Sequence, residues 1–149
     1  MNLFNEDFVD FINLLNQNNV SYILVGGYAV VIRGYSRTTG DIDLWVEKST
    51  LNSQKLEKAL VEFGLPNGAI PLDNFLSDEF DVFSIGRPPY AIEIMTAVKG
   101  LDYIEAFNNS TIEQIDGVKV RVVHLNQLRQ AKLAAGRHKD LNDLENLPS

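Results

Sequence analysis

The stretch that decides the fold is "VGGYAVVIRGYSRTTGDIDLWVE", residues 25–47. Its second half reads as a β-strand, because polar and apolar residues alternate through "DIDLWVE". Residues two apart on a strand point to the same side, so Asp41 and Asp43 share one face while Ile42 and Leu44 point to the other. Two carboxylates this close repel each other, so protonation, water or a cation has to relieve the repulsion.

A pair of glycines lies upstream of these acids. Gly26 and Gly27 end an apolar strand pattern and precede "YAVVIRG", which has the length of a short helix. The start of a helix presents free N–H groups to an anion, and glycines let phosphate oxygens come close. A hard divalent cation such as Mg²⁺ binds carboxylate and phosphate oxygens together. The stretch therefore indicates a phosphate site facing a metal site, although an Asp-x-Asp pair alone is also typical of a solvated strand end.

The composition excludes several classes of protein. The chain of 149 residues fits one domain, residues 1–149, and it contains no cysteine, which excludes disulfides, zinc-thiolate sites and thiol nucleophiles. Its net charge of −7 argues against general DNA binding. The first residues lack a basic secretory signal, and no apolar run is long enough to span a bilayer. We therefore expect a cytoplasmic protein without membrane contact.

Periodicity along the chain predicts alternating helices and strands. Helices are expected over residues 6–17, 28–34, 50–63 and 101–107 and twice in the C-terminal part, and strands over 20–25, 41–47, 80–85, 90–95, 111–115 and 118–125. Residues 64–78 are turn-rich and predicted to be irregular. Asn126 is expected to cap the first C-terminal helix, and Leu141, Leu144 and Leu147 to face inward on the second. This order predicts a mixed sheet flanked by helices, an α/β or α+β fold.

The spacing of the opening stretch matches neither a P-loop nor a dinucleotide-binding motif. The glycine pair, thirteen further residues and "DID" instead resemble the signature of nucleotidyltransferases of the DNA polymerase beta superfamily. The resemblance is to a small bacterial group related to abortive-infection toxins and antibiotic nucleotidyltransferases. Two later blocks, "GRPPYAIEIMTAVKGLDYIEAF" and "HLNQLRQAKLAAGRHKDLNDLENL", resemble the same group in the same order, so the resemblance runs from Tyr22 to Leu147. It implies a nucleotidyltransferase-like fold.

The resemblance also implies an activity and its metal ligands. It implies Mg²⁺-dependent transfer of a nucleoside monophosphate from an NTP to the hydroxyl of an RNA end, a protein or a small molecule, with release of pyrophosphate. Asp41, Asp43 and Glu93 would be the catalytic residues and would hold two Mg²⁺ ions, with Mn²⁺ as a substitute. The group usually has aspartate where this chain has Glu93, which is one methylene longer. On a strand, Glu93 faces away from its neighbours Ile92 and Ile94.

Further residues are implied to bind the nucleotide. They are Gly26, Gly27, Arg37, Thr39 and Lys132. Arg137, Lys139 and Asp140 are interpreted as contacts that hold the last two helices together. Because little chain remains beyond the core, a homodimer or a partner protein is expected to complete the acceptor site.

Two other classes of function are consistent with paired acids. A catalytically silent nucleotide-binding or regulatory module, as in a toxin-antitoxin pair, is favoured by the unusual Glu93. A metal-dependent nuclease would also use paired acids, but it gives no reason for the glycine pair at residues 26–27. The retained glycines and aspartates favour the enzyme.

Overall fold

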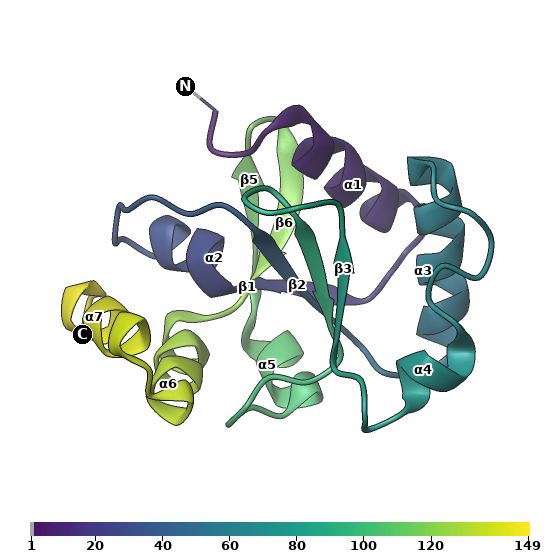
Figure 1. The fold of residues 1–149 in the computed structure, drawn as a ribbon. Helices are drawn as coiled ribbons and strands as arrows, with labels where there is room; N and C mark the ends of the chain where they lie inside the picture. The colour runs from purple at the N-terminus through teal and green to yellow at the C-terminus, as the bar shows by residue number, and fades with distance from the viewer. Residues whose placement is uncertain (1) are drawn as a thin grey trace.

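The computed structural model describes residues 2–149 and is built on one six-stranded mixed sheet. The strands are β1 (Tyr22–Val25), β2 (Ile42–Val46), β3 (Val82–Ile85), β4 (Ile92–Met95), β5 (Thr111–Ile115) and β6 (Val118–Val122). The helices are α1 (Glu6–Gln17), α2 (Gly26–Ile32), α3 (Thr50–Phe63), α4 (Leu72–Leu76), α5 (Tyr103–Asn109), α6 (Leu125–Ala135) and α7 (His138–Asn146). Figure 1 shows α1, α3 and α4 grouped to the right of the strands and α2, α6 and α7 grouped to the left. The predicted fold class is confirmed.

The order of the strands in the sheet is β3-β4-β2-β1-β6-β5, which places β2 near the centre. β1 runs antiparallel to β2 and parallel to β6, and β2 runs parallel to β4. The register of β2 and β4 sets Asp43 directly opposite Glu93. On the outer side of β4, the antiparallel strand β3 sets Ser84 opposite the same glutamate. These pairings bring residues from distant parts of the sequence into one row.

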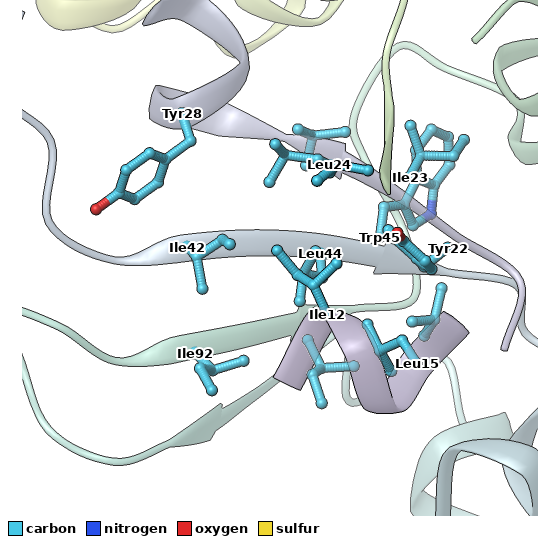
Figure 2. Packing of buried hydrophobic residues seen from close by; sticks show 14 of the residues in the cluster. Ile12, Leu15, Tyr22, Ile23, Leu24, Tyr28, Ile42, Leu44, Trp45 and Ile92 are labelled. Atoms are coloured by element: carbon cyan, nitrogen blue, oxygen red, sulfur yellow. The ribbon is translucent and has the colours of Figure 1, made fainter. Parts of the chain in front are cut away.

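The two faces of β2 carry different neighbours, as its alternating sequence predicts. On one face, Leu44 is fully buried, and Figure 2 shows Ile12 and Leu15 of α1 beside it. On the other face, Trp45 packs edge-on against Tyr103 of α5, with ring centroids 5.1 Å apart. The acids of β2 therefore lie on the α5 side, at the end of the strand where the apolar packing gives way to solvent.

Three sequence-based predictions about the elements are wrong in detail. α2 begins at Gly26 rather than at Tyr28, directly after β1. Residues 64–78 contain α4, which the burial of Phe75 and its stacking on Phe83, at 6.5 Å between centroids, stabilise. The cap of α6 is His124, whose Nδ1 accepts the Asn126 N–H at 3.0 Å.

The inward face of α7 is also different from the prediction. Leu147 is buried, but Leu141 is 44% exposed and does not face inward. The buried positions of this helix are Asp140 and Asp143, which are 0% and 1% exposed. An acid this buried needs paired charges around it, because burial of an isolated carboxylate is very costly. The partners of these two acids lie in the candidate site.

No helix within residues 2–149 has the length and apolar character to cross a membrane.

Candidate active site

One cleft of about 690 Å³ contains both halves of the opening stretch of sequence. Its polar and charged lining includes Thr39, Asp41, Asp43, Arg37, Lys132, Arg137, Lys139, Asp140 and Asp143, together with the glycine pair Gly26 and Gly27. Its apolar lining includes Val82 and Met95 of the sheet and Leu101, Leu128 and Ala131. All the predicted site residues except Glu93 are therefore in the lining of one cleft, which combines a charged part and an apolar part.

Two of the predicted acids, Asp41 and Asp43, line the cleft, and the third, Glu93, is the register partner of Asp43 on the neighbouring strand. Burial raises the pKa of Asp43 to about 6, with repulsion from Glu93 and Asp41 adding to the effect and Lys132 and Lys139 opposing it. Asp41 Oδ1 accepts the Ala91 N–H at 2.8 Å, and Glu93 Oε2 accepts the Ser84 hydroxyl at 2.5 Å. Asp41 and Glu93 thus each use one carboxylate oxygen within the protein. Asp43 is the acid whose pKa is raised by burial and by the other two acids together.

These residues fit a hard divalent cation in their donor chemistry, because all of their ligand atoms are carboxylate oxygens. Burial raises the pKa of Asp43, and repulsion from Glu93 and Asp41 adds to it, so a cation beside the three acids would favour the ionised form of Asp43. Nevertheless, no three His, Cys, Asp or Glu side chains within residues 2–149 are already grouped as ligands for one ion. The carboxylate of Glu93 is instead hydrogen-bonded to Ser84, on the side of β4 away from β2.

The glycine pair lies against the acids and the loop before them. A Cβ at Gly26 would overlap Oδ2 of Asp43, and the backbone there has φ +71°, in the left-handed region. A Cβ at Gly27 would overlap Oγ1 of Thr39. A residue with a side chain does not fit at either position, because the start of α2 lies directly against Asp43 at Gly26 and against Thr39 at Gly27.

We expect Gly26→Ala to lower the free energy of unfolding by about 1–3 kcal/mol more than Gly64→Ala does. Both glycines have positive φ, so both substitutions strain the backbone, but nothing lies within 4 Å of a Cβ at Gly64. The difference therefore isolates the overlap with Asp43. Urea unfolding of the two variants measures it, and equal losses of stability would contradict the close approach.

Three basic residues of the cleft, Arg37, Lys132 and Arg137, are bound to acids of α7. The Arg37 guanidinium donates to both oxygens of Asp143, at 2.8 and 3.0 Å, and Lys132 Nζ lies 3.0 Å from Asp143 Oδ2. Lys132 also lies 3.4 Å from Asp140 Oδ1, and Arg137 Nε donates to Asp140 Oδ2 at 2.7 Å. We call these five residues the α7 ion network. It holds three cations and two anions, so it retains one positive charge.

The network explains how two buried acids stay ionised. Burial alone would raise the pKa of Asp140 and Asp143, but hydrogen bonds from Arg137 to Asp140, and from Arg37 and Lys132 to Asp143, hold both pKa values below the ordinary range. Arg137 and Asp140 pair with each other at the start of α7, whereas the ion pairs between α6 and α7 are made by Lys132 with Asp140 and Asp143.

Two roles differ from the interpretation of the sequence. Lys139 is absent from the ion pairs found within residues 2–149; it lines the cleft, and its charge lowers the pKa of Asp43. Asp143 was missed, although it carries Arg37 and Lys132 together. The available signal was its spacing from Asp140. Residues three apart lie on the same face of a helix, so the two acids of "KDLND" are expected on one face of α7.

The raised pKa of Asp43 predicts a pH dependence of stability in metal-free buffer. The ordinary pKa is 3.8 and the folded value about 6, so the folded state holds the Asp43 proton more tightly than the unfolded state does. This contribution to stability is complete below the ordinary pKa and is lost as the pH rises through about 6, by about 3 kcal/mol in all.

Asp43→Asn mimics the protonated acid and should remove this part of the pH dependence. The variant should therefore be more stable than the unaltered chain at pH 8, and the two proteins should be about equally stable at pH 4. Thermal unfolding across this range checks the prediction. Asp140 and Asp143 do not interfere, because their pKa values are lowered. Parallel pH profiles for the two proteins would rule out the shift at Asp43.

Comparisons with known proteins identify the family and the fold. A family model described as "Nucleotidyltransferase of unknown function (DUF6036)" matches residues 6–147. A sequence search of curated proteins gives no match.

Solved structures with the same architecture include TM1012 of Thermotoga maritima, which is assigned as a nucleotidyltransferase. It has a TM-score of 0.60 and 16% identity, over 91% of this chain and 86% of that one. The lincomycin-bound lincosamide antibiotic adenylyltransferase LnuA has a TM-score of 0.57 and 16% identity, over 98% and 97% of the two chains. A nucleotidyltransferase-like antigenic protein from Paracoccidioides brasiliensis has a TM-score of 0.56 and 18% identity, over 93% and 72%. At these identities the likeness establishes the fold.

Proposed function

The chain belongs to the family described as nucleotidyltransferase of unknown function (DUF6036), and on that premise we propose that it transfers a nucleoside monophosphate from an NTP to an acceptor hydroxyl in a Mg²⁺-dependent reaction. Pyrophosphate is the second product. The observation that carries the proposal is the cleft itself, which Asp41, Asp43 and the glycine pair line together with basic side chains, among them Lys132 and Lys139, whose charges act on Asp43. An NTP with its metal carries both kinds of charge that such a cleft binds: the cation for the carboxylates and the phosphates for the basic side chains. The whole chain, residues 1–149, acts as one cytoplasmic domain in this proposal.

The proposed metal ligands are Asp41, Asp43 and Glu93. When bound, Mg²⁺, or Mn²⁺ in its place, neutralises charge on the phosphates and lowers the pKa of the acceptor hydroxyl. Asp43 lies between the other two acids in space, since Asp41 is two residues before it on the same chain segment and Glu93 is opposite it on β4. Glu93 is the group that takes the proton of the acceptor hydroxyl, because its carboxylate already accepts a hydrogen bond from a hydroxyl, that of Ser84.

The proposed phosphate-binding residues are Gly26, Gly27, Arg37, Thr39 and Lys132. The glycines lie close enough to Asp43 and Thr39 that phosphate oxygens bound there would meet backbone N–H groups. Arg37 and Lys132 serve the triphosphate while they remain bound to Asp143, because the α7 ion network keeps one positive charge in excess. Lys139, which makes no ion pair within the described residues 2–149, adds a further charge in the same part of the cleft.

We assign the acceptor to the apolar part of the cleft. Val82 and Met95 of the sheet and Leu128 and Ala131 of α6 contribute to its lining. LnuA, which matches this chain over nearly its full length, is described as an adenylyltransferase of a lincosamide antibiotic, a small molecule. A small apolar molecule that carries a hydroxyl is therefore one candidate acceptor, besides an RNA end or a protein. A second copy of the chain or a partner protein would complete the open side of this part.

The second candidate is a catalytically silent nucleotide-binding module of a toxin-antitoxin type. One observation favours it: the carboxylate of Glu93 is hydrogen-bonded to Ser84, and no three-ligand group is assembled within residues 2–149. Such a module would bind an NTP and transfer nothing.

The two candidates are separated by a label-transfer panel. The full chain is incubated with Mg²⁺ and each α-labelled NTP, in the presence of RNA, protein and small-molecule acceptors. Transfer of label with release of pyrophosphate supports the enzyme. NTP binding without transfer to any acceptor supports the silent module, and failure to bind any NTP with Mg²⁺ or Mn²⁺ rejects both.

A further inference from the structure

Ser84 places a hydroxyl in line with the carboxylates of the candidate active site. In the sheet, Ser84 of β3 is opposite Glu93 of β4, and Glu93 is opposite Asp43 of β2. The three residues therefore form one row across three adjacent strands. The Ser84 Oγ donates a hydrogen bond to Glu93 Oε2 at 2.5 Å. A hydroxyl within hydrogen-bond reach of a carboxylate that can take its proton is the arrangement of a nucleophile beside a general base.

The row places Ser84 and Asp43 on either side of Glu93. Neighbouring strands lie about 4.8 Å apart, so the Cα atoms of Ser84 and Asp43, two strands apart, are separated by roughly 10 Å, with Glu93 between them. Register partners point to the same face of a sheet, so the three side chains share one face. In the proposed function, the α-phosphate of the NTP is held at Asp43, over the same face of the sheet as the Ser84 hydroxyl.

We infer that Ser84 is itself an acceptor, so that the chain nucleotidylates its own Ser84. This inference rests on the proposed function. The Ser84 oxygen attacks the α-phosphorus and forms a phosphodiester bond, while the bond from the α-phosphorus to the oxygen shared with the β-phosphate breaks. Pyrophosphate leaves, and the proton of the hydroxyl passes to the Glu93 carboxylate and then to solvent. No oxidant or other reactant is needed.

The position of Ser84 also allows the product to be accommodated. β3 is the edge strand of the sheet within residues 2–149, and Ser84 is exposed there. A nucleotide attached to it can therefore extend into solvent without displacing the core. Each chain has one such serine, so one nucleoside monophosphate per chain is expected, in a reaction whose rate constant does not depend on protein concentration.

The test is incubation of the purified full chain with Mg²⁺ and each NTP, without any acceptor. Intact mass spectrometry is expected to show the addition of one nucleoside monophosphate, and peptide mapping to place it on Ser84. Ser84→Ala should abolish the addition. Thr111→Ala is the matched control, because Thr111 Oγ1 also donates to a glutamate, Glu113, at 2.7 Å, but it lies on β5 at the other edge of the sheet. This variant should be modified like the unaltered chain.

NTP binding is measured in parallel by equilibrium dialysis, so that failure of this inference is distinct from failure of the proposed function. Binding without any addition to the chain, or an addition that maps elsewhere and persists in Ser84→Ala, overturns the inference and leaves the proposed function to the acceptor panel. In that case Ser84 only orients Glu93. Absence of NTP binding to the unaltered chain overturns both.

Discussion

Asp43→Asn is expected to reduce nucleotidyl transfer by about 10³-fold or more, which corresponds to about 4 kcal/mol of lost transition-state stabilisation. The substitution keeps the shape of the side chain and removes its charge. Asp43 stands between Asp41 and Glu93, so no other carboxylate can take its place as a shared ligand. The rate of pyrophosphate release with the best acceptor from the label-transfer panel measures the effect.

The control for Asp43→Asn is Asp10→Asn, which removes the same charge from an exposed position on α1 and should leave transfer unchanged. Stability is a second control, because the same Asp43→Asn protein is expected to be more stable than the unaltered chain at pH 8. Loss of activity therefore cannot be assigned to unfolding. Retention of more than a tenth of the activity by Asp43→Asn would remove Asp43 from the proposed metal site.

The second large effect concerns the α7 ion network. Asp143→Ala is expected to lower the free energy of unfolding by about 3–5 kcal/mol, because the loss of one partner leaves buried charges without compensation. Asp143 is 1% exposed and Lys132 8% exposed, and Arg37 donates to both oxygens of Asp143. The substitution therefore leaves two cations near one acid, Asp140, that already binds Arg137.

Urea unfolding at pH 7 measures this loss. Glu145→Ala is the matched control, since Glu145 is an exposed acid on the same helix and its removal should change the free energy of unfolding by less than about 0.5 kcal/mol. A loss below about 1 kcal/mol for Asp143→Ala would mean that the network contributes no more than a surface ion pair does.

The sequence predicted the parts of the site that depend on local rules. The period of a strand places Asp41 and Asp43 on one face, and the glycine pair marks the change from β1 to α2. The resemblance to a known group then supplied Glu93 as the third acid, and the register of β2 and β4 sets it opposite Asp43. Local pattern alone could not have chosen this register, because residues 43 and 93 meet only through sheet pairing.

The parts that escaped prediction depend on contacts between distant segments. Arg37 and Asp143 are 106 positions apart, and their ion pair forms only when α7 packs beside the loop before β2. The same contact alters the expected inward face of α7, because Asp140 and Asp143 are buried while Leu141 is exposed. The hydrogen bond from Ser84 to Glu93 likewise requires the pairing of β3 with β4. No periodicity in either segment encodes such pairs.

The central claim is that the cleft binds an NTP together with a divalent cation at Asp41 and Asp43. Its most direct test is calorimetric titration of the full chain with an α,β-methylene NTP analogue, which cannot transfer its nucleotide, in the presence and absence of Mg²⁺. We predict one analogue bound per chain with Mg²⁺, and weaker binding when Mg²⁺ is omitted or when Asp43 is replaced by Asn. No binding of any of the four analogues, or binding of equal strength with and without Mg²⁺, would contradict the account.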